Sequence, residues 1–288
     1  MPLRVAAISF LNPAPLLYNF EHEPTASQLR SHYDVHYTTP ANCATELLNG
    51  TADLGLIPIA SLTPELAIVP GCTIASLHEV RSILLLVKNS QNLSDDAALR
   101  AVRTVAADAA SRSSQAYAHI LFEHFHQAKP SFVEHLADPI PMLAQADGAL
   151  LIGDPALLAR EHRGAIDAAH PGLLWLDLAA LWRELTGLPW VAAVWAVRPE
   201  AIDSAGVTAV QLIADLTASR DNGLAHIEEL VREWTPRLEV PAATIRAYLT
   251  ENIHYTLDAE CVQAIEEFRK LAAGIGVLPE LGKLNFLS

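Results

Sequence analysis

Two uninterrupted apolar runs of strand length constrain the fold of this chain more than any other feature. The first lies within residues 81–88, with a basic residue at each end, and the second lies within residues 190–198, about a hundred residues later, and ends at Arg198. An apolar run that does not alternate with polar residues predicts a strand buried on both faces, as in a parallel or mixed sheet covered by helices. We therefore interpret the runs as two strand crossovers: the chain leaves a first lobe by one and returns by the other.

The length of the chain also favours two lobes, because 288 residues exceed the usual size of one domain. The crossovers predict a discontinuous first lobe, residues 1–86 and 197–288, and a second lobe, residues 87–196. Before residue 198 strands alternate with helices, the order typical of a parallel sheet. The segment after Pro199 reads as helical throughout. The predicted fold is thus α/β, with two lobes, a helical C-terminal tail and a ligand cleft between the lobes, where small-molecule sites preferentially form.

The net charge of −14, from 33 acidic and 19 basic residues, limits the partners of the chain. Nucleic acids and anionic membrane surfaces reward basic patches, so we expect neither. No apolar run reaches the length of a membrane-spanning helix, and the first residues enter a strand-like pattern directly instead of forming an export signal. We therefore expect a cytoplasmic protein. A small anion stays open as a ligand, since helix N-termini and a few arginines can bind one.

Sequence signals for a metal or a cofactor are weak. The three cysteines are far apart and form no paired motif: Cys43, Cys72 and Cys261. His119, Glu123 and His126 have a spacing that could hold a metal on one helix, but an apolar stripe on the opposite face predicts that they face solvent. The chain lacks the glycine-rich nucleotide motifs, the hydrolase elbow and the zincin motif. We expect neither a metal nor a cofactor.

Polar residues follow two predicted strands at their carboxyl ends, the edge at which an open α/β sheet binds ligands. Asn12 lies at the turn after the first strand, and it could either cap the next helix or face the cleft. Asp154 lies in the turn after the strand at 148–152 and has the same two interpretations, of which the cap is favoured.

A third cluster opens the helix after the predicted strand at 103–108. Ser111, Ser113 and Ser114 lie there beside Arg112. Free N–H groups, the positive end of the helix dipole and several hydroxyl groups together suit an anion. A structural cap needs only one serine, so the surplus of hydroxyl groups places the anion site on equal terms with the structural interpretation.

Seven motifs, in order along the chain, resemble one family, the chorismate dehydratases of the futalosine route to menaquinone. They span residues 8 to about 198, and the C-terminal tail adds little to the resemblance. Each motif alone is weak, but their shared order is specific. They are ISFLN with the following PL, LNG, ADLGLIP, VRSILL, SRSS, ALLIGDPAL and TGLPWVAAVWA.

The resemblance implies a periplasmic-binding-protein-like fold and a reaction that removes water from chorismate to give 3-[(1-carboxyvinyl)oxy]benzoate, without a metal or redox cofactor. It makes Asn12 and Ser82 the candidate catalytic residues, which would hydrogen-bond the C4 hydroxyl or the enolpyruvyl group. Arg81 would pair with a carboxylate, or else form a hinge salt bridge. The other expected substrate contacts are Ser111, Ser113, Ser114, Pro58, Gly153 and Asp154.

The chemistry of this substrate asks little of the protein beyond positioning. Chorismate is a dianion, and loss of its C3 proton and its C4 hydroxyl yields an aromatic ring. An enzyme mainly has to hold the reactive conformer and stabilise the moving charge, and two lobes predict hinge closure around it. No carboxylate or histidine stands out as the base, so a route in which the substrate's own carboxylate takes the proton stays open.

Other proteins of this architecture are alternatives, because binding and catalysis share the fold. A solute-binding protein would normally carry an export signal, and a ligand-sensing domain would bring a basic DNA-binding segment. The sister family, 1,4-dihydroxy-6-naphthoate synthase, opens with a Ser-Pro-Cys-Pro-Asn-Asp type motif that this chain lacks. The ordered motifs favour the dehydratase, and the sequence predicts no oligomeric state.

Overall fold

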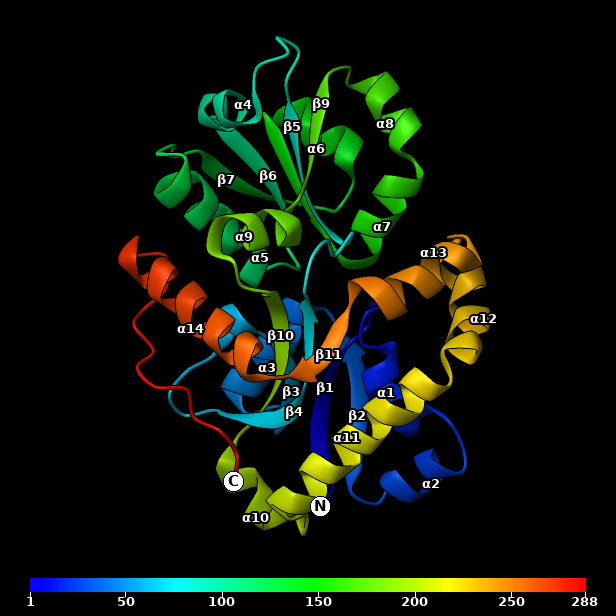
Figure 1. Ribbon diagram of the computed structural model, residues 1–288. Coiled ribbons are helices and arrows are strands. Elements are labelled where there is room, and N and C mark those ends of the chain that lie inside the picture. Colours follow the sequence, from blue (N-terminus) through cyan, green and yellow to red (C-terminus); the bar gives the residue numbers. More distant parts are fainter.

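The computed structural model describes the whole chain, except for the side chains of residues 203–205. The chain forms two α/β lobes, each built on one mixed β-sheet (Figure 1). In spatial order, the strands of the first sheet are β11 (His254–Leu257), β4 (Ala67–Ser76), β10 (Trp190–Val197), β3 (Leu54–Pro58), β1 (Leu3–Ile8) and β2 (Tyr33–Thr38). Those of the second sheet are β7 (Ser131–His135), β6 (Thr104–Asp108), β8 (Gly148–Ile152), β5 (Ile83–Lys88) and β9 (Leu173–Asp177).

Each apolar run forms one buried strand of a single sheet. β5 lies antiparallel between β8 and β9, and β10 lies antiparallel between β3 and β4. The remaining central pairs, β1 with β2 and β3 and β6 with β7 and β8, are parallel. Residues 83–86 thus belong to the second sheet and residues 190–196 to the first, contrary to the predicted borders. We propose the connections 77–82 and 187–189 as the borders of the two lobes.

The helices follow the strands along the chain and cover the sheets. In the first part of the chain, which belongs to the first lobe, the helices are α1 (Ala14–Glu21), α2 (Thr25–Leu29) and α3 (Pro40–Asn49), with a 3₁₀ turn at Ile59–Ser61. Those of the second lobe are α4 (Asp95–Ala101), α5 (Ser113–His119) with a π-helical continuation at Ile120–Phe125, α6 (Pro139–Gln145), α7 (Gly153–Glu161), α8 (Arg163–Ala169) and α9 (Leu178–Thr186).

Helix α3 shows how local sequence sets these boundaries. The Thr39 side chain accepts a hydrogen bond from the Asn42 backbone N–H and caps the helix, and Pro40 occupies the first turn, where its missing N–H costs nothing. Gly50 ends the helix with φ +79°, a conformation that glycine adopts without steric strain. Both boundaries of this helix thus follow from residues that lie at its ends.

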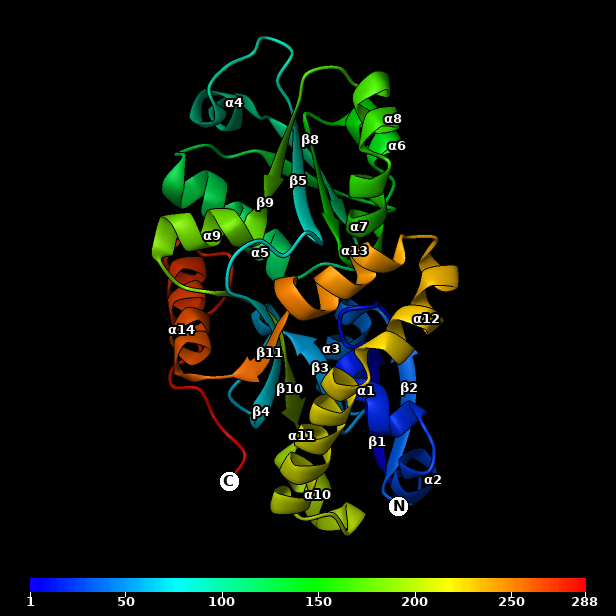
Figure 2. The same cartoon turned by 45° about the vertical axis from the view of Figure 1, so that its right-hand side comes forward.

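The C-terminal tail wraps around the first lobe and reaches the second. Its elements are α10 (Pro199–Ala205), α11 (Ala209–Ala225), α12 (Ile227–Leu238), α13 (Ala242–Ala247) with a π-helical turn at Tyr248–Asn252, β11, and α14 (Ala259–Gly274). Figures 1 and 2 show α13 directly beneath α7, and Thr244 donates a hydrogen bond to Glu161 there, at 3.2 Å. The all-helical prediction is therefore wrong at β11 and also after α14, where residues 275–288 are not helical and Phe286 forms an isolated β-bridge with Ile68.

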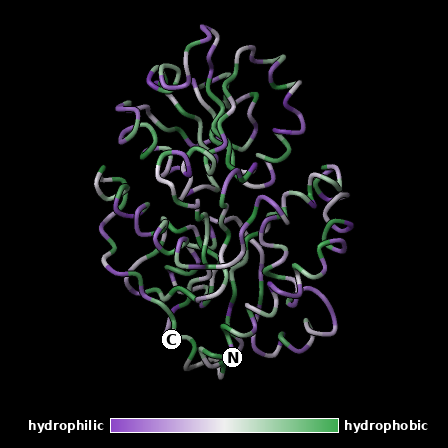
Figure 3. Tube along the Cα trace, viewed as in Figure 1, coloured by the Kyte–Doolittle hydropathy of each residue, from purple (hydrophilic) through white to green (hydrophobic). Residues whose placement is uncertain are grey.

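Apolar residues concentrate on the strands and on the inner faces of the helices, while polar residues mark the outer turns (Figure 3). One large buried cluster extends through both lobes. Its aromatic centre joins Tyr117 of α5 and Trp182 of α9 to Trp190 of β10 and Phe268 of α14, with ring centroids 4.9–6.3 Å apart. In the described part of the chain, no helix is long and apolar enough to cross a membrane.

Candidate functional site

A cavity lies between the lobes, at the carboxyl ends of β1 and β3. It contains about 570 Å³ of empty space, its open mouth included. Most of its wall is apolar. The polar side chains that line it come from both lobes and from the connection between them: Asn12, Ser82, Ser111, Arg112, Ser113 and Ser114. No Asp, Glu, His or Lys is part of this lining.

Asn12 lies in the cavity wall, just after β1. Helix α1 begins at Ala14, its N-cap position is Pro13, and no side chain caps it. The cap interpretation of Asn12 is therefore wrong. Its Oδ1 atom is buried and has no hydrogen-bond partner among the described residues. A buried carbonyl oxygen without a partner is costly, so this atom is available to a bound molecule.

Ser82 enters the cavity from the connection that precedes β5, and its side chain is only 1% exposed. The Tyr248 hydroxyl, which follows α13 in the C-terminal tail, donates a hydrogen bond to Ser82 Oγ at 2.7 Å. Tyr248 is fully buried, and its burial raises the pKa of the phenol well above 10. The Asn12 side chain also lies close to this hydroxyl. Sequence motifs did not reveal Tyr248, because it lies outside the span of the family resemblance.

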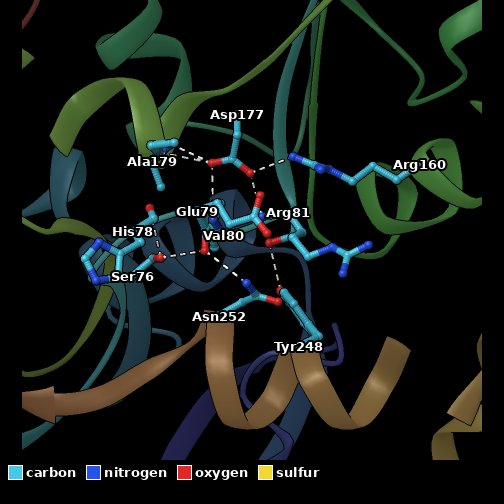
Figure 4. Close-up of polar contacts among 12 residues, drawn as sticks. Ser76, His78, Glu79, Val80, Arg81, Arg160, Asp177, Ala179, Tyr248 and Asn252 are labelled. Carbon is cyan, nitrogen blue, oxygen red and sulfur yellow. Dashed lines mark hydrogen bonds and ion pairs between the residues drawn. The ribbon is translucent and has the colours of Figure 1, made fainter. Parts of the chain in front are cut away.

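Arg81 does not line the cavity, contrary to the prediction. Its backbone has φ +66°, a left-handed conformation that is unusual for a residue with a side chain, and its Nε atom is buried without a partner. The predicted alternative, a hinge salt bridge, is not found either: among the described residues, no carboxylate forms an ion pair with its guanidinium group. Figure 4 shows that the Arg81 side chain extends away from Asp177.

Asp177 holds the connection that carries Arg81 and Ser82 (Figure 4). Its carboxylate accepts backbone N–H bonds from Val80 and Arg81, at 3.1 and 2.7 Å. The same carboxylate caps α9 and forms an ion pair with Arg160 at 2.8 Å. A buried carboxylate with this many donors is fully satisfied, so it fixes the backbone next to the cavity.

The tail holds the same connection from the other side. Asn252 donates a side-chain hydrogen bond to the Glu79 carbonyl oxygen at 3.2 Å, and Ser76 donates to that oxygen at 3.0 Å. Residues 79–82 are thus attached to the second lobe through Asp177 and to the first lobe through Ser76 and Asn252. The position of Ser82 in the cavity depends on both.

The three serines at the start of α5 have different surroundings. The N-cap position of the helix is Arg112, and no serine side chain caps it, so the cap interpretation is wrong. Ser113 Oγ donates to the Ala192 carbonyl oxygen at 3.1 Å and accepts from the Ala60 N–H at 3.2 Å. Its hydroxyl proton is therefore already used between the lobes. Ser111 Oγ is buried without a partner among the described residues, and Ser114 lines the cavity beside it.

Gly153 allows the lobes to approach each other closely. Its φ is +59°, and a Cβ atom at this position would lie 2.4 Å from the ring of Phe10, in the first lobe. Its N–H donates to the Ser82 carbonyl oxygen at 2.8 Å. Gly153 and Pro58, which ends β3, both line the cavity.

Asp154 joins the lobes instead of capping a helix. Helix α7 already begins at Gly153 without a side-chain cap, and the Asp154 carboxylate accepts the Leu11 backbone N–H at 2.9 Å. Burial raises the pKa of this carboxyl from 3.8 to about 6, although the hydrogen bond from Leu11 acts in the opposite direction. Arg112 forms another bond between the lobes, to Thr45 at 2.8 Å. Several direct contacts thus join the two lobes.

Clusters with the chemistry to hold a metal ion lie away from the cavity. One consists of His22, Glu229 and Glu233, and the other of His254, Asp258 and Cys261. Both are already engaged in protein contacts, since His22 pairs with Glu233 at 2.9 Å and Asp258 caps α14. None of these six side chains lines the cavity.

Comparison with solved structures identifies the fold. A protein from Archaeoglobus fulgidus matches with a TM-score of 0.71 at 14% identity, over 96% of this chain and 98% of its own. The periplasmic aliphatic sulphonate binding protein of Escherichia coli matches with a TM-score of 0.64 at 14% identity, over 97% of this chain and 94% of its own. The predicted two-lobed, periplasmic-binding-protein-like fold is confirmed.

Sequence comparison identifies the family. A chorismate dehydratase from Thermus thermophilus is 28% identical over 237 residues, which cover 78% of this chain and 82% of the relative. The family model described as menaquinone biosynthesis matches residues 3–274, nearly the whole chain. The protein with this cavity therefore belongs to the menaquinone biosynthesis family.

Proposed function

We propose that this protein is a chorismate dehydratase, which removes water from chorismate and releases 3-[(1-carboxyvinyl)oxy]benzoate. The observation that carries the proposal is the composition of the cavity. Amide and hydroxyl groups line a mostly apolar chamber, and no ionisable acid or base other than Arg112 lines it. Such a chamber suits a reaction that needs orientation and hydrogen bonding more than it needs a strong protein base.

The two carboxylates of chorismate would meet the hydroxyl-rich side of the cavity. Ser111 and Ser114 offer hydrogen bonds there, and Arg112 supplies a positive charge. Ser113 contributes less, because its hydroxyl group already bridges the lobes. Arg112 matters in a chain of net charge −14, since it is the one cation in the lining.

Asn12 and Ser82 would meet the reacting side of the ring. The free Oδ1 of Asn12 and the hydroxyl group of Ser82 can hold the C4 hydroxyl and the enolpyruvyl oxygen in the reactive conformer. In the reaction, a base removes the C3 proton, the C3–H electron pair enters the ring, and the C4–O bond breaks. The departing hydroxide takes up the proton that the base removed from C3 and leaves as water, which regenerates the base, so atoms and charge balance.

The proton acceptor is either a carboxylate of the substrate or Asp154. A role of the substrate's own carboxylate as the base is supported by the cavity lining, which contains no Asp or Glu. Asp154 lies immediately behind Gly153, and a pKa of about 6 would suit a general base near neutral pH. We favour the substrate carboxylate, because Asp154 is directed to the Leu11 N–H. We also propose a cytoplasmic location, where a biosynthetic enzyme of this kind would meet its substrate.

The experiment that tests the proposal is incubation of the purified protein with chorismate, without added metal or nucleotide. Mass spectrometry and ultraviolet absorbance follow the product. We expect the loss of one water and an aromatic chromophore. Tight binding without turnover would instead support a binding protein on the same fold. If the protein neither binds chorismate nor turns it over, the proposed substrate is wrong.

A further inference from the structure

We propose that Tyr248, in the C-terminal tail, is a positioning residue that directs the hydroxyl proton of Ser82 into the cavity. The inference rests on the proposed function, because it concerns how Ser82 meets the substrate. The two hydroxyl oxygens are 2.7 Å apart. Tyr248 is 0% exposed and Ser82 is 1% exposed, so this contact is shielded from solvent.

The direction of this hydrogen bond decides which proton remains free. A tyrosine hydroxyl and a serine hydroxyl can each donate one proton and accept another. In the structure the Tyr248 phenol is the donor and Ser82 Oγ is the acceptor. Because burial raises the pKa of the Tyr248 phenol, Tyr248 keeps its proton across the working pH range. The hydroxyl proton of Ser82 is then not used in the contact with Tyr248, and no described residue accepts a hydrogen bond from it.

Ser82 is therefore a donor toward the cavity that it lines. An oxygen that accepts one hydrogen bond becomes a better donor of its own proton, because the bonds polarise each other. The group that most needs a donor in the dehydration is the departing C4 oxygen, which takes the electron pair of the C4–O bond. Ser82 would stabilise that oxygen by a hydrogen bond, without transferring its proton. Asn12 Oδ1, an acceptor without a partner, complements this donor.

The chain supplies a matched control for Tyr248. Tyr255, on β11, is a second buried tyrosine, 4% exposed, in the electrostatic range of Tyr248. Its hydroxyl group has no partner among the described residues and does not reach the cavity lining. Tyr248→Phe and Tyr255→Phe remove the same atom from neighbouring buried rings, and only the first removes a contact with Ser82.

The test is a double-mutant cycle with chorismate as the substrate and kcat and KM as the readouts. For Tyr248→Phe we expect kcat to fall about 10- to 100-fold with KM changed less than about 2-fold, since a transition-state contact weakens while ground-state binding remains. Ser82→Ala should lower kcat at least as far. The double variant should match Ser82→Ala, because Tyr248 acts through Ser82. Tyr255→Phe should keep the wild-type kcat.

Each other outcome overturns the inference. If Tyr248→Phe keeps the wild-type kcat, changes only KM, or lowers kcat equally in the Ser82→Ala background, Tyr248 does not act through Ser82. Thermal unfolding checks that each variant folds. If Tyr248→Phe alone does not fold, the double variant can replace it, because it leaves no unpaired hydroxyl group. A kcat of the double variant below that of Ser82→Ala would then contradict the inference. If wild-type protein does not turn over chorismate, the proposed function itself fails, which is distinct from a failure in the variants alone.

Discussion

The Asp154 carboxylate, in the second lobe, accepts a hydrogen bond from the backbone N–H of Leu11, in the first lobe, at 2.9 Å. This contact ties the start of α7 to the turn that carries Asn12. It places an ionisable group in the closed interface, where burial raises its pKa to about 6. The contact between the lobes therefore responds to pH.

Asp154→Asn should change the pH dependence of stability. The pKa of Asp154 rises from 3.8 when unfolded to about 6 when folded, so the folded state holds the proton more tightly. The folded protein therefore loses stability as pH rises from about 4 to about 6. Above pH 6 Asp154 is ionised in both states, and its burial then lowers the free energy of unfolding by at most about 3 kcal/mol, from a change of about two in pKa. Asparagine keeps the acceptor for Leu11 without the charge. We expect the variant to be more stable than wild type at pH 7.5 and nearly equal at pH 4, by chemical denaturation; an equal difference at both pH values would contradict this.

Asn12→Ala should reduce turnover while leaving stability nearly unchanged. Its Oδ1 atom has no protein partner, so folding loses little when the side chain is shortened. If it orients the reacting groups, kcat should fall by about 100-fold or more, as when one preorganised polar contact is removed from an active site. Steady-state kinetics and thermal unfolding measure the two effects. Asn42→Ala, on the exposed face of α3, is the control and should keep wild-type kcat. Near-normal turnover of Asn12→Ala would rule out a catalytic role.

Ser113→Ala should mainly lower stability, whereas Ser114→Ala should mainly weaken substrate binding. Removal of the Ser113 hydroxyl leaves the Ala60 N–H and the Ala192 carbonyl without this partner, which should cost about 1–3 kcal/mol of stability. Ser114 faces the cavity, so its replacement should raise KM several-fold with little loss of stability. Urea unfolding and kinetics of both variants test the contrast. Equal effects of the two substitutions would show that the hydroxyl groups are not divided in this way.

Gly153→Ala should destabilise the closed structure. The added methyl group would meet the Phe10 ring at 2.4 Å, in a backbone conformation with φ +59° that alanine rarely adopts. We expect a loss of about 1–3 kcal/mol from strain and overpacking, together with lower activity. Phe10→Leu in the same chain should recover part of that loss. Gly164→Ala, on α8 with open space around its Cβ position, should be neutral or stabilising.

The sequence predicted the α/β architecture well because its signals are local. Apolar runs such as 83–87 identify strands covered on both faces, and turn residues such as Gly50 end helices wherever they occur. The ordered motifs also brought Asn12, Ser82 and Gly153 to one cavity. Strand β11, with four residues at a sheet edge, was too short to be distinguished from the surrounding helical pattern.

What the sequence did not predict depends on contacts between distant segments. Tyr248 reaches Ser82 across 166 residues, and no periodicity reports such a pair. Ser113 looked like an anion ligand because its hydroxyl group is typical of one, but the approach of Ala60 and Ala192 uses both its donor and its acceptor. Asp177 lay at the start of a helix predicted from Asp177 to Thr186, and nothing in the sequence indicated that it would also accept hydrogen bonds from the connection between the lobes. The roles of these side chains are thus set by contacts between segments that lie far apart in the sequence.

The position of β10 between β3 and β4 has a consequence for the order in which the lobes fold during synthesis. The second sheet is continuous in sequence, from β5 to β9, and can form as soon as those residues leave the ribosome. The first sheet lacks a central strand until residue 197 is made, although its first strand was made long before. We expect protease-resistant fragments of the second lobe to appear first on chains arrested after residue 190. The amino-terminal part of the first sheet would then stay incomplete, with apolar strand edges exposed, until β10 is made after the second lobe.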